Sequence, residues 1–334
     1  MSDRYRFGRV DLPPEQHRAL KKAVRWEVFT ICYTSVTIAL VAVVVGNSQA
    51  MRTAWIEDML SLIPQLAFLT ALIFVRRRPS RRHPYGLHRT MGVGHLVAGV
   101  ALLVVGLNLA IEAVTGLLAA EHPTIGTVRV LGHTVWLGWF MILVMAVIVV
   151  GPVFVYGPAK AKLAPVLHNK LLFADADMAK ADWHTNVASV VGVLGIGLGV
   201  WWLDGAAALF ISVGIIHDGF RNTKSAVIDL MDQQARTYDD KSVHPLAAEV
   251  VRLARGHGWI ADAAVRLRDM GQVFHLEVFV QPRRTRVRTS DLTALAEEIT
   301  ALDWKVQDVV VIPAENLPDE ADDAAEAREE ESSR

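Results

Sequence analysis

The chain has 334 residues, of which 52% are hydrophobic and 21% are charged, and its formal net charge is -1. Its mean hydropathy of +0.30 and its long uncharged runs predict a membrane protein rather than a soluble domain. Basic residues cluster beside these runs instead of forming a continuous surface, which argues against a nucleic-acid partner. The single cysteine, Cys32, excludes both a disulfide within one chain and a cysteine metal cage.

Six apolar runs approach the length that crosses a bilayer, so we predict six membrane spans. Residues 1–26 precede the spans, and the six-helix domain covers residues 27–232. The runs are Val28–Gly46, Leu60–Val75 with an extension back to about Met51, Val93–Ile111, Val130–Val155, Val187–Leu203 with an extension back to about residue 171, and the shorter Gly205–Ile216 with its flanks.

Basic residues between the spans predict the orientation of the chain. Residues 76–82 read Arg-Arg-Arg-Pro-Ser-Arg-Arg and follow the second run, and Lys160, Lys162 and Lys170 follow the fourth. The loops on the opposite side are poor in basic residues. The positive-inside rule therefore places both termini in the cytoplasm, with the chain in an inner or plasma membrane.

A different pattern follows the last span. Its α-β-β-α-β order over residues 240–314 predicts a two-layer α+β domain with both helices on one face of the sheet. The acidic residues 315–334 lack periodicity, and we expect them to be disordered. The predicted elements are a helix over His244–His257, strands over Ala263–Arg268 and Val273–Val280 joined by a turn at Met270-Gly271, a helix from a cap at Ser290 to Leu302, and a strand over Val306–Ile312.

Carboxylates within the apolar segments are the feature most informative about function. Glu57 and Asp58 lie in the second span, and Asp175, Asp177 and Asp182 lie in the first part of the fifth. An acid at the bilayer centre costs roughly 2.5–3.5 kcal/mol on insertion scales, so such residues face the protein interior or a water-filled path. A bound cation offsets the repulsion among them.

Helical spacing places these acids on two faces. Asp58 shares a face with Ser61. Asp175, Met178 and Asp182 recur three and four residues apart and form a polar stripe. Asp58 and Asp182 lie about 9 Å and about 16 Å from opposite surfaces of a core roughly 30 Å thick, within about a turn of the same level. Carboxylates with at most one thioether suit Mn²⁺, Fe²⁺, Co²⁺ or Zn²⁺.

Asp58 and Asp182 lack an obvious structural partner in the sequence, so they carry the hypothesis of a cation site most directly. Ordinary structural roles remain open for the others: the water boundary for Asp175 and Asp177, packing for Met178, and the outer interface for Glu57.

Two motifs make the chain resemble the cation diffusion facilitator family. The fifth-helix pattern of that family, S/A-D-A-x-H-x-x-x-D, is matched by residues 174–182, with Met178 in place of the usual histidine. The loop pattern H-P-Y-G-H-G-R is matched by residues 83–89, with Leu87 and His88 as departures. The family's second helix carries H/D-x-x-x-D; here the first place falls on Asp58 or Glu57 and the second on Leu62 or Ser61.

The resemblance covers about residues 28–313 and implies six membrane helices followed by a cytoplasmic ferredoxin-like domain that forms a homodimer. It implies an efflux transporter, not an enzyme, that exchanges a divalent cation for protons by alternating access and holds no resident cofactor. Its partners are then the metal cation, protons, membrane lipids and a second copy. The implied metal site uses Asp58 and Asp182, with Glu57, Ser61, Met178 and Asp175 in support.

The departures from the family pattern leave a four-ligand tetrahedral zinc site incomplete. Either Glu57, Ser61 or His184 compensates, or the metal differs, or transport is lost. The last alternative describes a membrane sensor or scaffold that signals metal without transporting it. An enzyme is disfavoured, because the sequence shows no nucleophile–base pair or glycine-rich phosphate loop.

Three further histidines are secondary candidates. His275, in Phe-His-Leu-Glu, is the candidate for a second metal site in the C-terminal domain, because family members bind metal there. His83 and His88 lie in the basic loop, where they either relay cations, contact lipid head groups or form part of a solvated loop.

Overall fold

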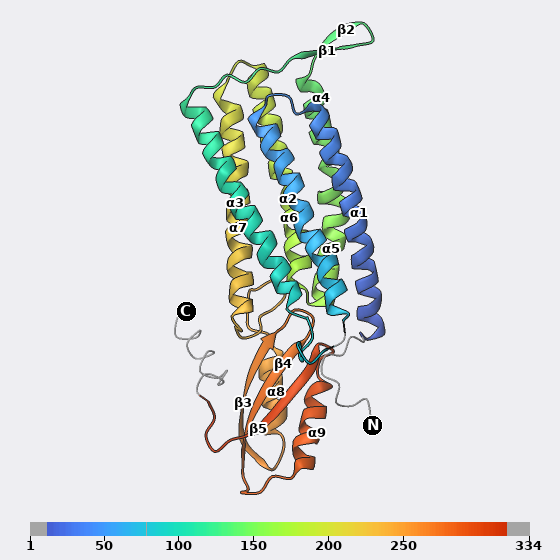
Figure 1. The fold of residues 1–334 in the computed structure, drawn as a ribbon, viewed down its shortest axis with the longest axis vertical. Helices are drawn as coiled ribbons and strands as arrows, with labels where there is room; N and C mark the ends of the chain where they lie inside the picture. The colour runs from blue at the N-terminus through green and yellow to red at the C-terminus, as the bar shows by residue number, and fades with distance from the viewer. Residues whose placement is uncertain (1–11, 78, 319–334) are drawn as a thin grey trace. The chain divides into compact units, whose positions relative to one another are not determined.

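The computed structural model of the protein describes residues 12–77 and 79–318, which divide into two compact units (Figure 1). One unit is helical and comprises residues 16–71 and 93–227. The other comprises residues 12–15, 72–92 and 228–318 and contains a three-stranded sheet. The tail predicted to be disordered falls largely on residues 319–334, outside the described residues.

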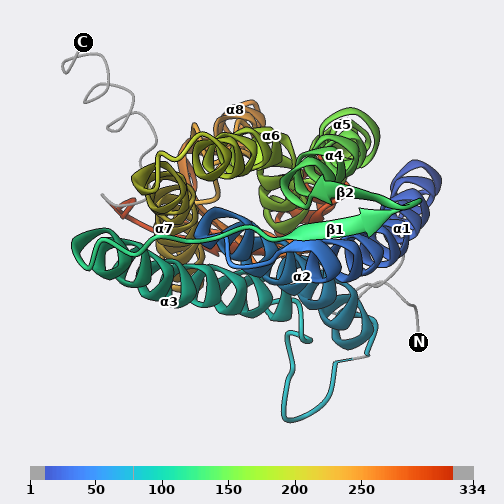
Figure 2. The same cartoon turned by 90° about the horizontal axis from the view of Figure 1, so that it is seen from above.

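Five helical segments of the described chain have the length and hydropathy of a membrane span: α1 (Pro14–Val44), α2 (Gln49–Val75), α3 (Thr90–Leu118), residues 138–167, and α7 (Trp202–Leu230). A further helix, α6 (Lys170–Gly197), is as long but carries Asp175, Asp177, Lys180 and Asp182. Seen from above, α3, α2 and α1 form one row, and α7, α6 and the α4–α5 segment form a second (Figure 2). The acids of α2 and α6 therefore come from helices in different rows.

The predicted span over Val130–Val155 is wrong at both ends. Its first residues belong to a hairpin of β1 (Thr127–Val130) and β2 (His133–Trp136), whose turn uses positive φ at Leu131 and Gly132. The strands, with Arg129, His133 and Thr134, are more polar than α4, but their apolar residues are continuous with the helix. A short apolar run does not separate a strand from a helix.

The helix begins only after this hairpin and extends well beyond Val155. It runs as α4 (Gly138–Ile148), continues through a π-helical turn, η2 (Gly151–Tyr156), and ends as α5 (Gly157–Leu167). Lys160 and Lys162 therefore lie in α5 and not in a loop, which corrects one part of the orientation argument. The basic residues of 76–82 and Lys170 are unaffected.

A carboxylate of α7 caps the start of α2. Asp204 is fully buried, and its two oxygens accept hydrogen bonds from the backbone N–H groups of Gln49 (2.6 Å) and Ala50 (3.2 Å) and from the hydroxyl of Ser48 (2.6 Å). A negative charge at a helix N-terminus satisfies free N–H groups and complements the helix dipole. This contact couples the first turn of α2 to α7.

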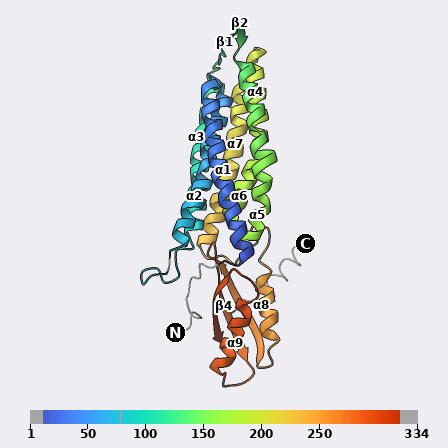
Figure 3. The same ribbon diagram turned by 90° about the vertical axis from the view of Figure 1, so that its right-hand side faces the viewer.

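The C-terminal domain confirms the predicted order of elements. It consists of α8 (Leu246–Arg255), β3 (Ile260–Asp269), β4 (Phe274–Pro282), α9 (Thr289–Thr300) and β5 (Val306–Pro313). Strand β4 pairs antiparallel with β3 and parallel with β5, and Figure 3 shows α8 and α9 beside β4. Both helices pack on the same strand residues, because Val250 of α8 and Leu295 of α9 share one core with Val265 and Val278. One detail was wrong: Ser290 lies in the first turn of α9, and Arg288 occupies the N-cap position.

Candidate cation site in the helical unit

The acids of α2 and α6 lie close together inside the helical unit. Asp182 interacts electrostatically with Glu57 and Asp58, and all three side chains are half-buried. The hydroxyl of Thr185, one turn along α6, hydrogen-bonds the carboxylate of Glu57. The two helices therefore face each other through this acidic site, which we define as Glu57, Asp58 and Asp182.

Two oxygen atoms at the acidic site are buried without a hydrogen-bond partner among the described residues. One is Oε2 of Glu57, and the other is Oδ1 of Asn186. The amide nitrogen of Asn186 donates to the backbone carbonyl of Asp182 at 2.7 Å, which leaves the oxygen as a free acceptor. Buried acceptors that lack a donor are unfavourable. Oxygen atoms of this kind are ligands for hard and borderline divalent cations.

The acidic side chains alone do not form a complete set of metal ligands. Across the part of the chain that the structure describes, no three His, Cys, Asp or Glu side chains come together in a group that could hold a metal ion. A cation at this site would therefore take only part of its ligands from these side chains. Amide oxygens and water molecules would supply the rest, as in sites that keep some of the ion's hydration.

Two tyrosines that the sequence analysis did not identify border the acidic site. Tyr33 of α1 and Tyr156 of η2 lie with ring centroids 5.8 Å apart, and each interacts electrostatically with Asp58 and Asp182. The hydroxyl of Tyr33 donates to the carbonyl of Ile148 at 2.8 Å. The π-helical turn that carries Tyr156 gives no signal in the sequence. Such turns are frequent at functional sites.

Gly151, the first residue of the π-helical turn, lies directly against the ring of Tyr33. A Cβ atom at Gly151 would lie 2.4 Å from Cζ and 2.7 Å from the hydroxyl oxygen of Tyr33. Any larger residue here would force the phenol to move.

Asp175 is held by a lysine instead of lying free beside the other acids. The ammonium of Lys160 donates to Asp175 at 2.5 Å and to Glu27 of α1 at 3.0 Å, and Lys160 is fully buried. We name this group the buried ion triad. Asp175 is thus paired within the buried ion triad, and its support for a metal stays a prediction. Sequence reasoning missed the partner because Lys160 was assigned to a loop.

The other supporting candidates have local partners. The hydroxyl of Ser61 donates to the backbone carbonyl of Asp58 at 2.8 Å. Met178 packs against an apolar cluster of α2, α3 and α7. His184 is exposed, and its ring lies 3.8 Å from that of Trp183. The roles of Ser61, Met178 and His184 in metal binding stay predictions.

His275 lies in the C-terminal domain between two acids. Its Nδ1 is 2.5 Å from the carboxylate of Asp308, and its Nε2 is 3.8 Å from that of Glu277. The two carboxylates therefore contact different nitrogens of the ring. This arrangement orients the imidazole and does not direct the three side chains to one point. In the same unit, Tyr85 contacts the imidazole edge-on with centroids 6.1 Å apart.

His88 and His83 differ in their surroundings. His88 is buried, and burial lowers its pKa to about 4, so the imidazole is neutral at pH 7. The expected role for His88 in relaying cations or binding head groups does not fit a buried neutral ring. His83 is exposed, as expected of a solvated loop.

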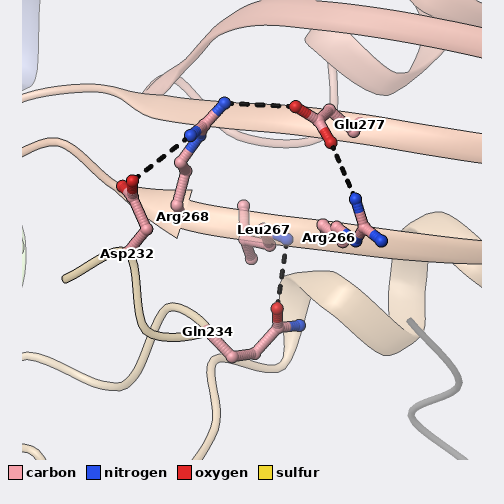
Figure 4. A pocket seen from close by; sticks show the side chains of 6 residues that line it. All are labelled: Asp232, Gln234, Arg266, Leu267, Arg268 and Glu277. Carbon is pink, nitrogen blue, oxygen red and sulfur yellow. Dashed lines mark hydrogen bonds and ion pairs between the residues drawn. The ribbon is translucent and has the colours of Figure 1, made fainter. Parts of the chain in front are cut away.

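A cavity of about 380 Å³ lies on the face of the sheet that carries Glu277 (Figure 4). Arg268 contacts Glu277 at 3.1 Å and Asp232 at 3.5 Å, and Arg266 contacts Glu277 at 3.5 Å. Two arginines and two acids balance each other in this cavity. It therefore offers neither a cation nor an anion an unmatched charge.

Comparison with known proteins identifies the family. Residues 27–231 match the family model of the cation efflux transmembrane domain. The match spans more than half of the chain, which therefore belongs to the cation efflux family and is a multi-pass membrane protein. The resemblance to cation diffusion facilitators is thereby confirmed.

Two relatives from Bacillus subtilis (strain 168) cover most of the chain. The chain is 25% identical to the uncharacterized transporter YdbO over 281 residues, which are 81% of this chain and 88% of YdbO. It is 22% identical to the manganese efflux system protein MneS over 270 residues, which are 80% of this chain and 86% of MneS.

Proposed function

We propose that the protein exports a divalent transition-metal cation across an inner or plasma membrane in exchange for protons. The observation that carries this proposal is the acidic site, where carboxylates of α2 and α6 meet beside two unpaired oxygen acceptors. Membership of the cation efflux family supports cation transport. Protons and a metal compete for the same carboxylates, so binding of the metal releases protons.

The donors at the acidic site favour a metal that accepts oxygen ligands. In our proposal Asp58 and Asp182 bind the cation, Glu57 assists, and the free amide oxygen of Asn186 takes the place that the sequence analysis gave to Met178. Oxygen donors with retained water suit Mn²⁺ better than the softer members of the series. The name of one relative, a manganese efflux protein, points the same way. Competition among Mn²⁺, Fe²⁺, Co²⁺ and Zn²⁺ for the purified protein tests this order.

A non-transporting sensor or scaffold is the rival function. It shares the acidic site and differs only in that bound metal does not cross the membrane. Metal-driven uptake into proteoliposomes separates the two, because a sensor binds the metal without flux. Binding without uptake would establish the rival.

We propose that α6 is a sixth span and that both termini are cytoplasmic. The acids of α6 contact other helices, so they need not face lipid. With six spans the basic residues of 76–82 lie on the same side as the termini. A reporter fused after Arg334 is expected to be active only in its cytoplasmic form. Activity of a periplasmic or extracellular reporter at that position would reverse the orientation.

We propose that the C-terminal domain is ferredoxin-like and dimerises. Its core is self-contained, because α8 and α9 pack on the sheet of the same unit. An isolated fragment of the residues after Asp232 is expected to sediment as a dimer at high micromolar concentration. A monomer under those conditions would count against this interface and not against the fold.

A further inference from the structure

An ion-pair cluster joins α6 to α7 beside the acidic site. The guanidinium of Arg221 donates to the carboxylate of Asp177 at 2.7 Å and lies 3.8 Å from that of Asp218. The three side chains are 47%, 34% and 26% exposed, respectively. We name these residues the Arg221 cluster. Two carboxylates and one guanidinium give it a formal net charge of -1.

The depth of the Arg221 cluster indicates that it is exposed to water. At about 1.5 Å per residue, Asp177 lies about 10 Å along α6 from its first residue, Lys170, and Arg221 lies about 14 Å before the end of α7. Charged groups at such depth are strongly disfavoured in hydrocarbon and usually face a water-filled cavity. Partly exposed charges at this level are therefore expected to face water rather than lipid.

The Arg221 cluster is electrostatically continuous with the acidic site. Asp218 interacts with Glu57, which in turn interacts with Asp182. Asp177 precedes Asp182 by five residues on α6. A cation that enters between α6 and α7 from the ends nearest Asp177 and Arg221 therefore meets this cluster before it reaches Asp182.

We propose, on the basis of the proposed function, that the Arg221 cluster is the cytoplasmic entrance for the cation and that Arg221 limits access. When no metal is present, the guanidinium neutralises the charge of Asp177 and partly screens the negative charge of Asp218. An arriving divalent cation displaces the guanidinium from Asp177 and passes on to Glu57. Arginine stays charged at all physiological pH values, so Arg221 itself keeps its charge. Charges at the mouth of a cleft change the local concentration of an approaching ion.

A charge-matched series tests the proposal through the KM for Mn²⁺ in proteoliposomes. Arg221→Gln gives the cluster a net charge of -2 and is expected to lower KM by about threefold to tenfold. Asp177→Asn gives a net charge of 0 and is expected to raise KM by a similar factor. The double variant Arg221→Gln/Asp177→Asn restores -1 and is expected to return KM to within about twofold of the wild type. Maximal rates stay comparable, and the differences shrink at high ionic strength.

The same loss of charge at a distant site is the control. Lys22 is exposed on α1, and Lys22→Gln is expected to leave KM unchanged. A folding defect does not lower KM, so the gain in Arg221→Gln is not explained by lost structure. If Arg221→Gln does not fold, Asp218→Asn keeps the Arg221–Asp177 pair and is still expected to raise KM.

Two results would overturn the assignment: an unchanged or raised KM in folded Arg221→Gln, or an unchanged KM in Asp218→Asn. Both leave the proposed function intact as long as the wild type transports Mn²⁺. Absence of Mn²⁺ flux in the wild type would instead refute the proposed function, and the entrance with it.

Discussion

Asp182→Asn is expected to lower metal-driven flux by about a hundredfold or more, because even residues behind a metal ligand change affinity by 10–100-fold. The substitution keeps the shape of the side chain and removes its charge from the acidic site shared with Glu57 and Asp58. It also removes a costly acid from a membrane helix, so insertion should not suffer. Initial rates of Mn²⁺ uptake into proteoliposomes, at matched amounts of protein, measure the effect.

At saturating Mn²⁺, Asp177→Asn is the comparison variant for that experiment, because the proposed entrance affects KM and not the maximal rate. It makes the same chemical change five residues earlier on α6, at a side chain paired with Arg221. It is expected to retain the maximal rate and to change only KM. Equal flux in the wild type and Asp182→Asn would refute the acidic site and most of the argument for transport between α2 and α6.

Lys160→Met is expected to destabilise the protein by about 3–5 kcal/mol, the usual cost of removing one partner from a buried ion pair. The ammonium is the shared partner of Glu27 and Asp175, and the structure buries all three side chains almost completely. Its loss leaves two buried carboxylates facing each other. The shift is measured as the change in the free energy of unfolding in detergent, with the helical signal as readout.

Two variants show whether charge or packing causes this loss. Lys162→Met, at an exposed position two residues along α5, should leave stability nearly unchanged. Replacing the whole triad, as in Glu27→Met/Lys160→Met/Asp175→Leu, should recover much of the lost stability, because apolar replacements of buried ion groups are often neutral or better. Wild-type stability in Lys160→Met would show that the triad is not closely paired.

The sequence predicted helices and strands well where a single spacing of apolar residues, helical or alternating, ran through the segment. Alternating apolar residues identified β3 and β4, and the turn at Met270-Gly271 is present, with φ of 100° at Gly271. The acids of α2 and α6 were also placed together correctly, since helical depth can be counted along the chain. These features depend on neighbours in sequence or on simple geometry.

Features that depend on long-range contacts were missed. The role of Lys160 is set by Glu27, which lies 133 residues away on another helix. Tyr156 lies in the π-helical turn between α4 and α5, and its ring packs against that of Tyr33 on α1. A single apolar sequence does not reveal such a turn. The hairpin before α4 was missed because its apolar residues, such as Val135 and Trp136, are continuous with the helix, although Arg129 and His133 make the strands more polar than α4.

The cap that Asp204 places on α2 has a mechanical consequence. A helix tied at its first turn to a neighbour cannot slide or rotate independently of it without breaking three hydrogen bonds. Displacement of α7 is thus transmitted along α2 to the residues that it carries. On the other side, Lys160 ties α6 to α1 and α5. Asp204 thus fixes α2 to α7, Lys160 fixes α6 to α1 and α5, and the Asp177–Arg221 pair joins α6 to α7. A change in the spacing of the two halves of the acidic site therefore strains the Asp177–Arg221 pair.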